Sequence, residues 1–169
     1  MCNEILFLIV HFLFYNIFMG KYSDRAKNYF YEGYNCAQAV FLAFAEDIGF
    51  EKNIALKISS SFGGGMGRLR EVCGAVSSMF ALAGYFKGYT EPNNDEVKAK
   101  HYEYIQSLAE KFKAKHETII CRELLDLEPG ADSPIPEKRT PEYYKSRPCA
   151  KFIETAASII ESEFADYLN

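Results

Sequence analysis

Residues 149–168 read CAKFIETAASIIESEFADYL, and this stretch decides the expected fold. Apolar side chains recur in it at steps of three and four residues, with polar residues between them. That period is typical of an α-helix with one buried face, and Pro148 fits the first turn of such a helix. The buried face comprises Cys149, Phe152, Ile153, Ala156, Ile160, Phe164 and Leu168. We therefore predict a packed terminal helix over 149–167 that begins at a buried cysteine.

The same helical period runs through most of the preceding chain, and the alternation typical of strands is weak. Gly33 and Gly49 are expected to end two helices, and Asn35 is a good N-cap for the second of them. Residues 19–169 are therefore expected to form one all-α domain, a multi-helix bundle. Its predicted helices cover residues 24–31, 36–48, 51–60, 72–86, 94–117, 118–127 and 149–167.

Two segments interrupt the helical pattern. Residues 62–68 read FGGGMGR, and each glycine inside a helix costs about 1 kcal/mol relative to alanine, so we predict an interhelical loop with unusual backbone angles. Such a loop serves either as a tight turn or as a place where backbone amides approach a ligand. The second interruption is an irregular excursion marked by Pro129, Pro134, Pro136 and Pro141.

The composition is that of an ordinary globular protein and excludes several functional classes. The 169 residues suffice for one core, and the net charge of −4 is spread without a basic stripe, so no nucleic acid is expected as a partner. The glycine block follows no strand and lacks Gly-Lys-Ser/Thr, and no Ser–His–Asp arrangement is visible. We therefore predict neither a hydrolase nor a nucleotide-binding protein, and the sequence leaves open whether the protein is an enzyme.

The first 18 residues do not resemble the rest of the chain. Ile5 to Phe18 is almost continuously apolar, yet it is shorter than the roughly 20 residues that span a bilayer. It also lacks the basic start of a secretory signal. This leader is a mis-assigned start, a short hydrophobic anchor or a packed helix, and only the anchor would bring the protein to a membrane. We favour a cytoplasmic protein that starts at Met19.

Four of the five cysteines belong to the folded part, because Cys2 falls in the leader. By helical spacing all four face inwards, and each falls in the first turn of its predicted helix, where free N–H groups favour thiolate. Inert burial is the alternative, because cysteine often acts as a small hydrophobe. The separations of 37, 48 and 28 positions exclude the local pairs of a zinc finger or CxxC motif. The four are Cys36, Cys73, Cys121 and Cys149.

The segments around these cysteines resemble a known family. Residues 62–68 followed by Val72-Cys73-Gly74-Ala75, together with Tyr34-Asn35-Cys36, Cys121 and Arg147-Pro148-Cys149, are similar to the C_GCAxxG_C_C family of bacterial and archaeal redox-active proteins. The resemblance covers about residues 24–162. It implies an all-helical domain with a redox role inferred from the cysteines, often encoded near transporters. One departure is Ser78, which stands where the family has a glycine, so a close helix contact is expected to be looser there.

The resemblance also links the chain to the split-Soret cytochromes, which carry an iron–sulfur cluster and haem. This chain has no CxxCH, so covalent haem is not expected. The first hypothesis is therefore an iron–sulfur protein for electron transfer or sensing. Its [2Fe–2S] or [4Fe–4S] cluster would be bound by Cys36, Cys73, Cys121 and Cys149. The residues expected to lie against this cofactor are Gly63, Gly64, Gly65, Gly67 and Arg68.

Two further hypotheses use the same cysteines. In one, pairs of them cycle between dithiol and disulfide without any cofactor. In the other, the cysteines bind structural zinc, or the protein is an accessory of a transporter. A redox partner protein is expected but not identified, and a homodimer is left open. Arg70 could stabilise thiolates electrostatically, whereas His116 is expected on the charged surface rather than as a ligand.

Overall fold

The computed structural model describes residues 20–168, so the predicted leader at 1–18 lies outside the described residues. This part of the chain is helical without strands, which confirms the all-α prediction. The longer helices are α2 (Lys21–Tyr31), α3 (Cys36–Ala45), α4 (Lys52–Ser60), α6 (Gly74–Lys87), α7 (Asp95–His116) and α10 (Cys149–Glu163). The short ones are α5 (Gly63–Met66), α8 (Cys121–Leu124), α9 (Pro141–Ser146) and a 3-10 helix (Ala165–Tyr167).

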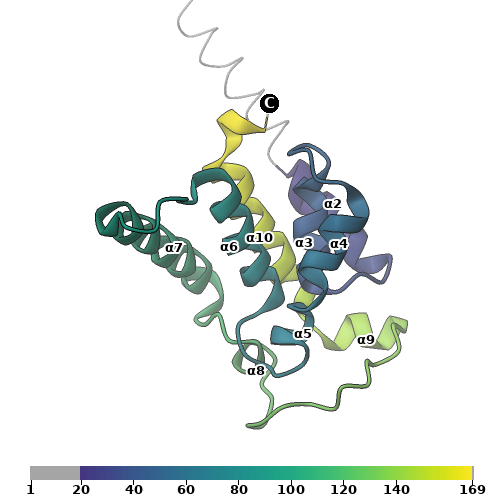
Figure 1. Cartoon of the computed structure of the whole chain (residues 1–169). Coiled ribbons are helices and arrows are strands. Elements are labelled where there is room, and N and C mark those ends of the chain that lie inside the picture. The colour runs from purple at the N-terminus through teal and green to yellow at the C-terminus, as the bar shows by residue number, and fades with distance from the viewer. Residues whose placement is uncertain (1–19, 169) are drawn as a thin grey trace, which may run out of the picture.

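Helix α3 lies at the centre of the bundle. It packs against α2, α4, α6 and α10, while α10 also packs on α2 and α6, and α7 lies on the outside against α6 and α10. Figure 1 shows that the short helices α5, α8 and α9 gather at one end of this bundle. The N-termini of α3, α6 and α10 point to the same end, because the cysteines at their starts line one pocket there.

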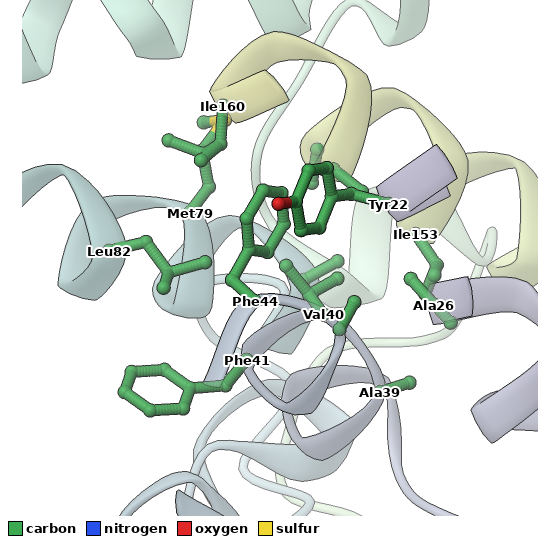
Figure 2. Close-up of a cluster of buried hydrophobic side chains, with 14 of the residues drawn as sticks. Tyr22, Ala26, Ala39, Val40, Phe41, Phe44, Met79, Leu82, Ile153 and Ile160 are labelled. Carbon is green, nitrogen blue, oxygen red and sulfur yellow. The ribbon is translucent and has the colours of Figure 1, made fainter. Parts of the chain in front are cut away.

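A dry aromatic and aliphatic core holds the long helices together (Figure 2). The rings of Tyr22 and Phe44 stack with centroids 4.3 Å apart, which joins α2 to α3. Met79 of α6 and Ile160 of α10 are fully buried beside them. Burying one such side chain contributes about 1.5–3 kcal/mol. This core fixes the helix axes, and with them the positions of the cysteines at the helix starts.

Several predicted boundaries need correction. The helix expected at 118–127 shrinks to α8, because residues 119–121 instead pair with the backbone of residues 71–73. Helix α9 was not predicted: Pro141 was read as a breaker but occupies the first turn, where Thr140 caps the Tyr143 amide at 3.3 Å. Helix α3 ends at Ala45 and α10 at Glu163, each a few residues early.

The Ser78 position behaves differently from the expectation of a looser contact. Ser78 is buried, and its hydroxyl donates a hydrogen bond to the Ala37 carbonyl at 2.8 Å. The hydroxyl therefore joins α6 to α3 where a glycine would only let them approach.

None of the helices between residues 20 and 168 combines the length and apolar character that a bilayer-spanning segment needs.

Candidate redox site

A pocket of about 50 Å³ lies at the end of the bundle where the short helices gather. All four cysteines of the described chain line it, although they come from four different helices or helix starts. Cys36, Cys121 and Cys149 are each the first residue of a helix, and Cys73 is the N-cap of α6. Side chains separated by up to 113 positions therefore meet at one place, as Cys36 and Cys149 do.

The start of α3 is fixed by a capping box, which places Cys36. The Asn35 side chain accepts hydrogen bonds from the amides of Ala37 and Gln38, and the Gln38 side chain accepts one from the Asn35 amide. Asn35 also donates to the Ser60 carbonyl at 3.1 Å, which ties this cap to the end of α4. Such a cap contributes about 1 kcal/mol, and it fixes the direction in which Cys36 leaves the backbone.

Cys73 and Cys121 are positioned by one short backbone pairing. The Cys73 amide donates to the Ile119 carbonyl at 2.8 Å, and the Cys121 amide donates to the Glu71 carbonyl at 2.6 Å. The extended pairing continues as an isolated bridge between Val72 and Ile120. Both cysteines are consequently presented from adjacent segments, and both are buried.

Cys36 and Cys73 interact through their thiol groups. A hydrogen bond from the Cys73 thiol lowers the pKa of Cys36 to about 6, and the amides of Gly64, Ala37 and Gly74 lower it further against the opposing effect of burial. The same hydrogen bond, reinforced by burial, raises the pKa of Cys73 well above its ordinary value. At neutral pH, Cys36 is therefore the thiolate of the pair and Cys73 the thiol that donates to it.

Two glycines make room for the cysteines. A Cβ on Gly74 would lie 2.7 Å from Cys36 Sγ and 2.6 Å from the Phe62 carbonyl oxygen. A Cβ on Gly65, whose φ is +69°, would lie 2.5 Å from Cys121 Cβ. No side chain fits at either distance, so Gly74 allows the backbone to approach the Cys36 sulfur and Gly65 allows it to approach the Cys121 side chain.

Cys121 and Cys149 lie among arginines. Arg70 is buried, and its Nη1 lies 3.8 Å from Cys121 Sγ. Burial raises the pKa of Cys121, and the hydrogen bond from Arg70 partly opposes this. Burial followed by the charge of Cys36 raises the pKa of Cys149 to about 12, although Arg147 and Arg139 act in the opposite direction. These two cysteines are thiols at neutral pH.

The family model described as "Putative redox-active protein (C_GCAxxG_C_C)" matches residues 34–163. This match covers most of the chain and all the residues that line the pocket except Phe30 of α2. The chain belongs to the C_GCAxxG_C_C family. No curated protein matches the chain, and neither does any solved structure.

All four cysteines that line the pocket lie within the matched residues 34–163. Of the glycines predicted to lie against a cofactor, Gly64 lines the pocket. Gly63 instead packs on Asn35, Gly65 packs on Cys121, and Gly67 takes a left-handed conformation at the end of α5. The unusual backbone predicted for this block is confirmed, since Gly64, Gly65, Met66 and Gly67 all have positive φ.

Arg68 does not line the pocket but anchors the excursion that covers it. Its side chain donates to the Ser133 carbonyl and pairs with Asp132 at 2.7 Å. Arg70 pairs with the same Asp132 carboxylate. The two arginines of the family's glycine segment therefore tie residues 132–133 to the site.

The sequence prediction missed three polar side chains of the pocket, namely Arg139 of the excursion, Tyr143 of α9 and Arg147 at the end of α9. Only Arg147 carried a signal, because it stands two positions before Cys149. His116 was expected on the charged surface and is instead half-buried, with Nε2 2.8 Å from the Thr155 hydroxyl and its ring beside Phe112 and Phe152. It does not line the pocket.

The donor set fits an iron–sulfur cluster in its chemistry. Four cysteines line the pocket while none of its lining residues is a histidine or a carboxylate, and thiolate sulfur is the usual ligand of such clusters. Between residues 20 and 168, no three cysteine, histidine or acidic side chains are placed to ligate a single metal ion. Cys36 and Cys73 are joined by a hydrogen bond, and Cys121 and Cys149 line the same pocket.

Proposed function

We propose that the four-cysteine pocket is a redox centre that holds an iron–sulfur cluster, with Cys36, Cys73, Cys121 and Cys149 as its ligands. The observation that supports this is the meeting of four cysteines, all within the family match, around one pocket. The cluster would supply one-electron transfer when bound. The contact between Cys36 and Cys73 suits a [2Fe–2S] cluster in particular, because its thiolates are bound two to each iron.

The surrounding residues are suited to this role. The amides of Gly64 and Gly74 donate to the Cys36 sulfur, and Arg70 donates to the Cys121 sulfur. Hydrogen bonds to ligand sulfur stabilise negative charge there and raise the reduction potential. Phe30, Leu124 and Phe152 complete the lining and limit the access of water.

Anaerobic purification of the full chain followed by iron and sulfide analysis tests the proposal. We expect a coloured protein with equal amounts of iron and acid-labile sulfide, and an electron paramagnetic resonance signal after one-electron reduction. Replacement of any one of the four cysteines by serine should abolish or strongly reduce iron retention, whereas Cys2→Ser is the matched control. A colourless protein that takes up no iron on reconstitution, or one that holds stoichiometric zinc instead, contradicts the proposal.

The contact between Cys36 and Cys73 also favours a second function, thiol–disulfide exchange. The Cys36 thiolate would attack a disulfide of an oxidised partner protein, forming a mixed disulfide and releasing one partner thiolate. Cys73, on losing its proton to that thiolate, would then attack Cys36 Sγ, leaving a Cys36–Cys73 disulfide and a fully reduced partner.

Thiol titration before and after mild oxidation distinguishes this second function. Metal-free protein should lose two thiols, and neither Cys36→Ser nor Cys73→Ser should lose any by the same route. Cys149→Ser is the control and should still lose two. Four titratable thiols in both states among these cysteines contradict thiol–disulfide exchange.

A further inference from the structure

Arg139 is the least satisfied charged group at the pocket. Its guanidinium lies over three aromatic rings, with Cζ 4.9 Å from the ring centroid of Phe30, 4.7 Å from that of Tyr143 and 5.9 Å from that of Tyr144. Nη2 donates a long hydrogen bond of 3.5 Å to the Tyr34 carbonyl. Nη1 is buried, and no residue between 20 and 168 accepts a hydrogen bond from it.

The other arginines at this end of the molecule all have carboxylate partners. Asp132 pairs with Arg68 and Arg70, and Glu137 pairs with Arg68 and Arg147. Arg139 forms no ion pair with any residue in the described range. Four guanidinium groups thus share two carboxylates, and with the Cys36 thiolate counted, one excess positive charge remains around the pocket at neutral pH.

A cation with a buried and unsatisfied N–H is costly unless an acceptor accompanies it. The aromatic rings hold the Arg139 guanidinium in place but cannot accept the hydrogen bond of Nη1 in its plane. Because Arg139 lines the same pocket as the four cysteines, a ligand bound there would meet this guanidinium. The small volume of the pocket limits a free ligand to a few heavy atoms.

We propose that the pocket binds an anionic ligand and that the unpartnered Nη1 of Arg139 donates a hydrogen bond to it. This negative charge has two sources that share one chemistry. One source is an iron–sulfur cluster, which together with its four cysteine thiolates is an anion. This source rests on the proposed function. The other is a free small oxyanion in the metal-free protein, and this source does not depend on a cluster.

The first arm of the test uses the metal-free, reduced full chain and inorganic sulfate. Calorimetric titration at constant ionic strength compares the original chain with Arg139→Gln and with Arg25→Gln. The latter is the matched control, because Arg25 lies on α2, pairs with Asp47 and does not line the pocket. If the anion is a free one, sulfate affinity should fall about tenfold or more in Arg139→Gln, as for a lost hydrogen bond to charge, and not in Arg25→Gln.

The second arm uses the iron- and sulfide-reconstituted protein and measures its midpoint potential. If the anion is the cluster, loss of the Arg139 charge should disfavour the reduced state by about tenfold in its equilibrium constant, a shift of about 59 mV to lower potential. Glu137→Gln removes a carboxylate from the exposed surface and is expected to act in the opposite direction, raising the potential or tightening sulfate binding.

Glu137 lies on the surface, so Glu137→Gln is expected to fold even if Arg139→Gln does not, and it then provides the test by itself. An effect in either arm, with the expected signs for these variants, supports the proposal. It is overturned if the original chain binds no sulfate and takes up no cluster, or if the variants match the Arg25→Gln control in both arms. Failure of the cluster alone, with sulfate binding retained, refutes the proposed function but not this inference.

Discussion

The pocket has two halves, which differ in the groups that surround their cysteine sulfur atoms. Cys36 and Cys73 lie at the starts of α3 and α6, two well-packed helices of the bundle. Their thiol groups form a hydrogen bond with each other, and Cys36 also accepts hydrogen bonds from backbone amides. Cys121 and Cys149 sit beside the irregular excursion and face the side chains of arginines. The first half holds a thiolate, whereas the second half holds thiols that face the cationic side chains of arginines. The difference predicts distinct reactivities for cysteines in the same small space.

The largest expected effect is on alkylation rates. Cys36 and Cys149 are both partly exposed, so access differs little between them, but their pKa values are about 6 and about 12. In metal-free reduced protein at pH 7, Cys36 is mostly thiolate and Cys149 almost wholly thiol. We expect iodoacetamide to modify Cys36 at least about a hundredfold faster than Cys149, allowing for the lower nucleophilicity of a low-pKa thiolate.

Peptide mass spectrometry over a time course measures these rates. The Cys36 rate should fall as the pH drops below about 6, because its thiolate is then protonated. The same chain unfolded in urea is the control, and there the two cysteines should react at similar rates. Equal rates in the folded protein would show that the two halves do not differ in the way described.

The next effect is on stability, through the glycine that lets α6 approach Cys36. Gly74→Ala places a methyl group against Cys36 Sγ and the Phe62 carbonyl, so we expect a loss of about 1–3 kcal/mol in the free energy of unfolding. Gly84→Ala is a matched control in the same helix, where an added Cβ meets nothing within 4 Å. It should stabilise the protein by about 0.5–1 kcal/mol. Urea unfolding compares the two, and similar behaviour would mean that the close approach at Gly74 carries no strain.

A smaller effect is expected on the pH dependence of stability. The pKa of Cys36 is about 6 in the folded protein and about 8.5 in an unfolded chain, so between these values the unfolded state binds more protons. The stabilisation by the Cys36 thiolate is therefore present above pH 8.5 and is lost as the pH falls through 6. In metal-free reduced protein, the rise in stability from pH 6 to pH 8 should be weaker in Cys36→Ser.

Cys149→Ser is the control for this measurement. Its raised pKa makes the thiol destabilising only above about pH 8.5, where the unfolded chain ionises and the folded protein does not. The slope between pH 6 and pH 8 should therefore be unchanged in Cys149→Ser. A slope that is equally unchanged in Cys36→Ser would contradict the thiolate assignment.

The two halves also differ in how far the sequence predicts them. The bundle follows from helical periodicity, and the Asn35 cap and the cysteines at helix starts could be read from local residues. The excursion could not, because Arg139 and Asp132 act through contacts with residues more than 60 positions away. Proline there was read as a breaker, although Pro141 begins a helix. The asymmetry within the Cys36–Cys73 pair depends on tertiary hydrogen bonds that no spacing encodes.

The smallest expected effect concerns the attachment of the excursion to the rest of the site. Asp132 accepts from both Arg68 and Arg70, and hydrogen bonding by Arg70 lowers its pKa to about 2, so this link should persist to strongly acidic pH. Asp132→Asn removes the charge but retains the shape of the side chain. We expect a few-fold faster proteolytic cleavage within residues 126–140, which are almost all exposed, and little change in global unfolding. Glu142→Gln, in the first turn of α9 but outside these ion pairs, is the control. Cleavage at equal rates in both variants would show that the excursion is held by the Arg139 ring contacts rather than by Asp132.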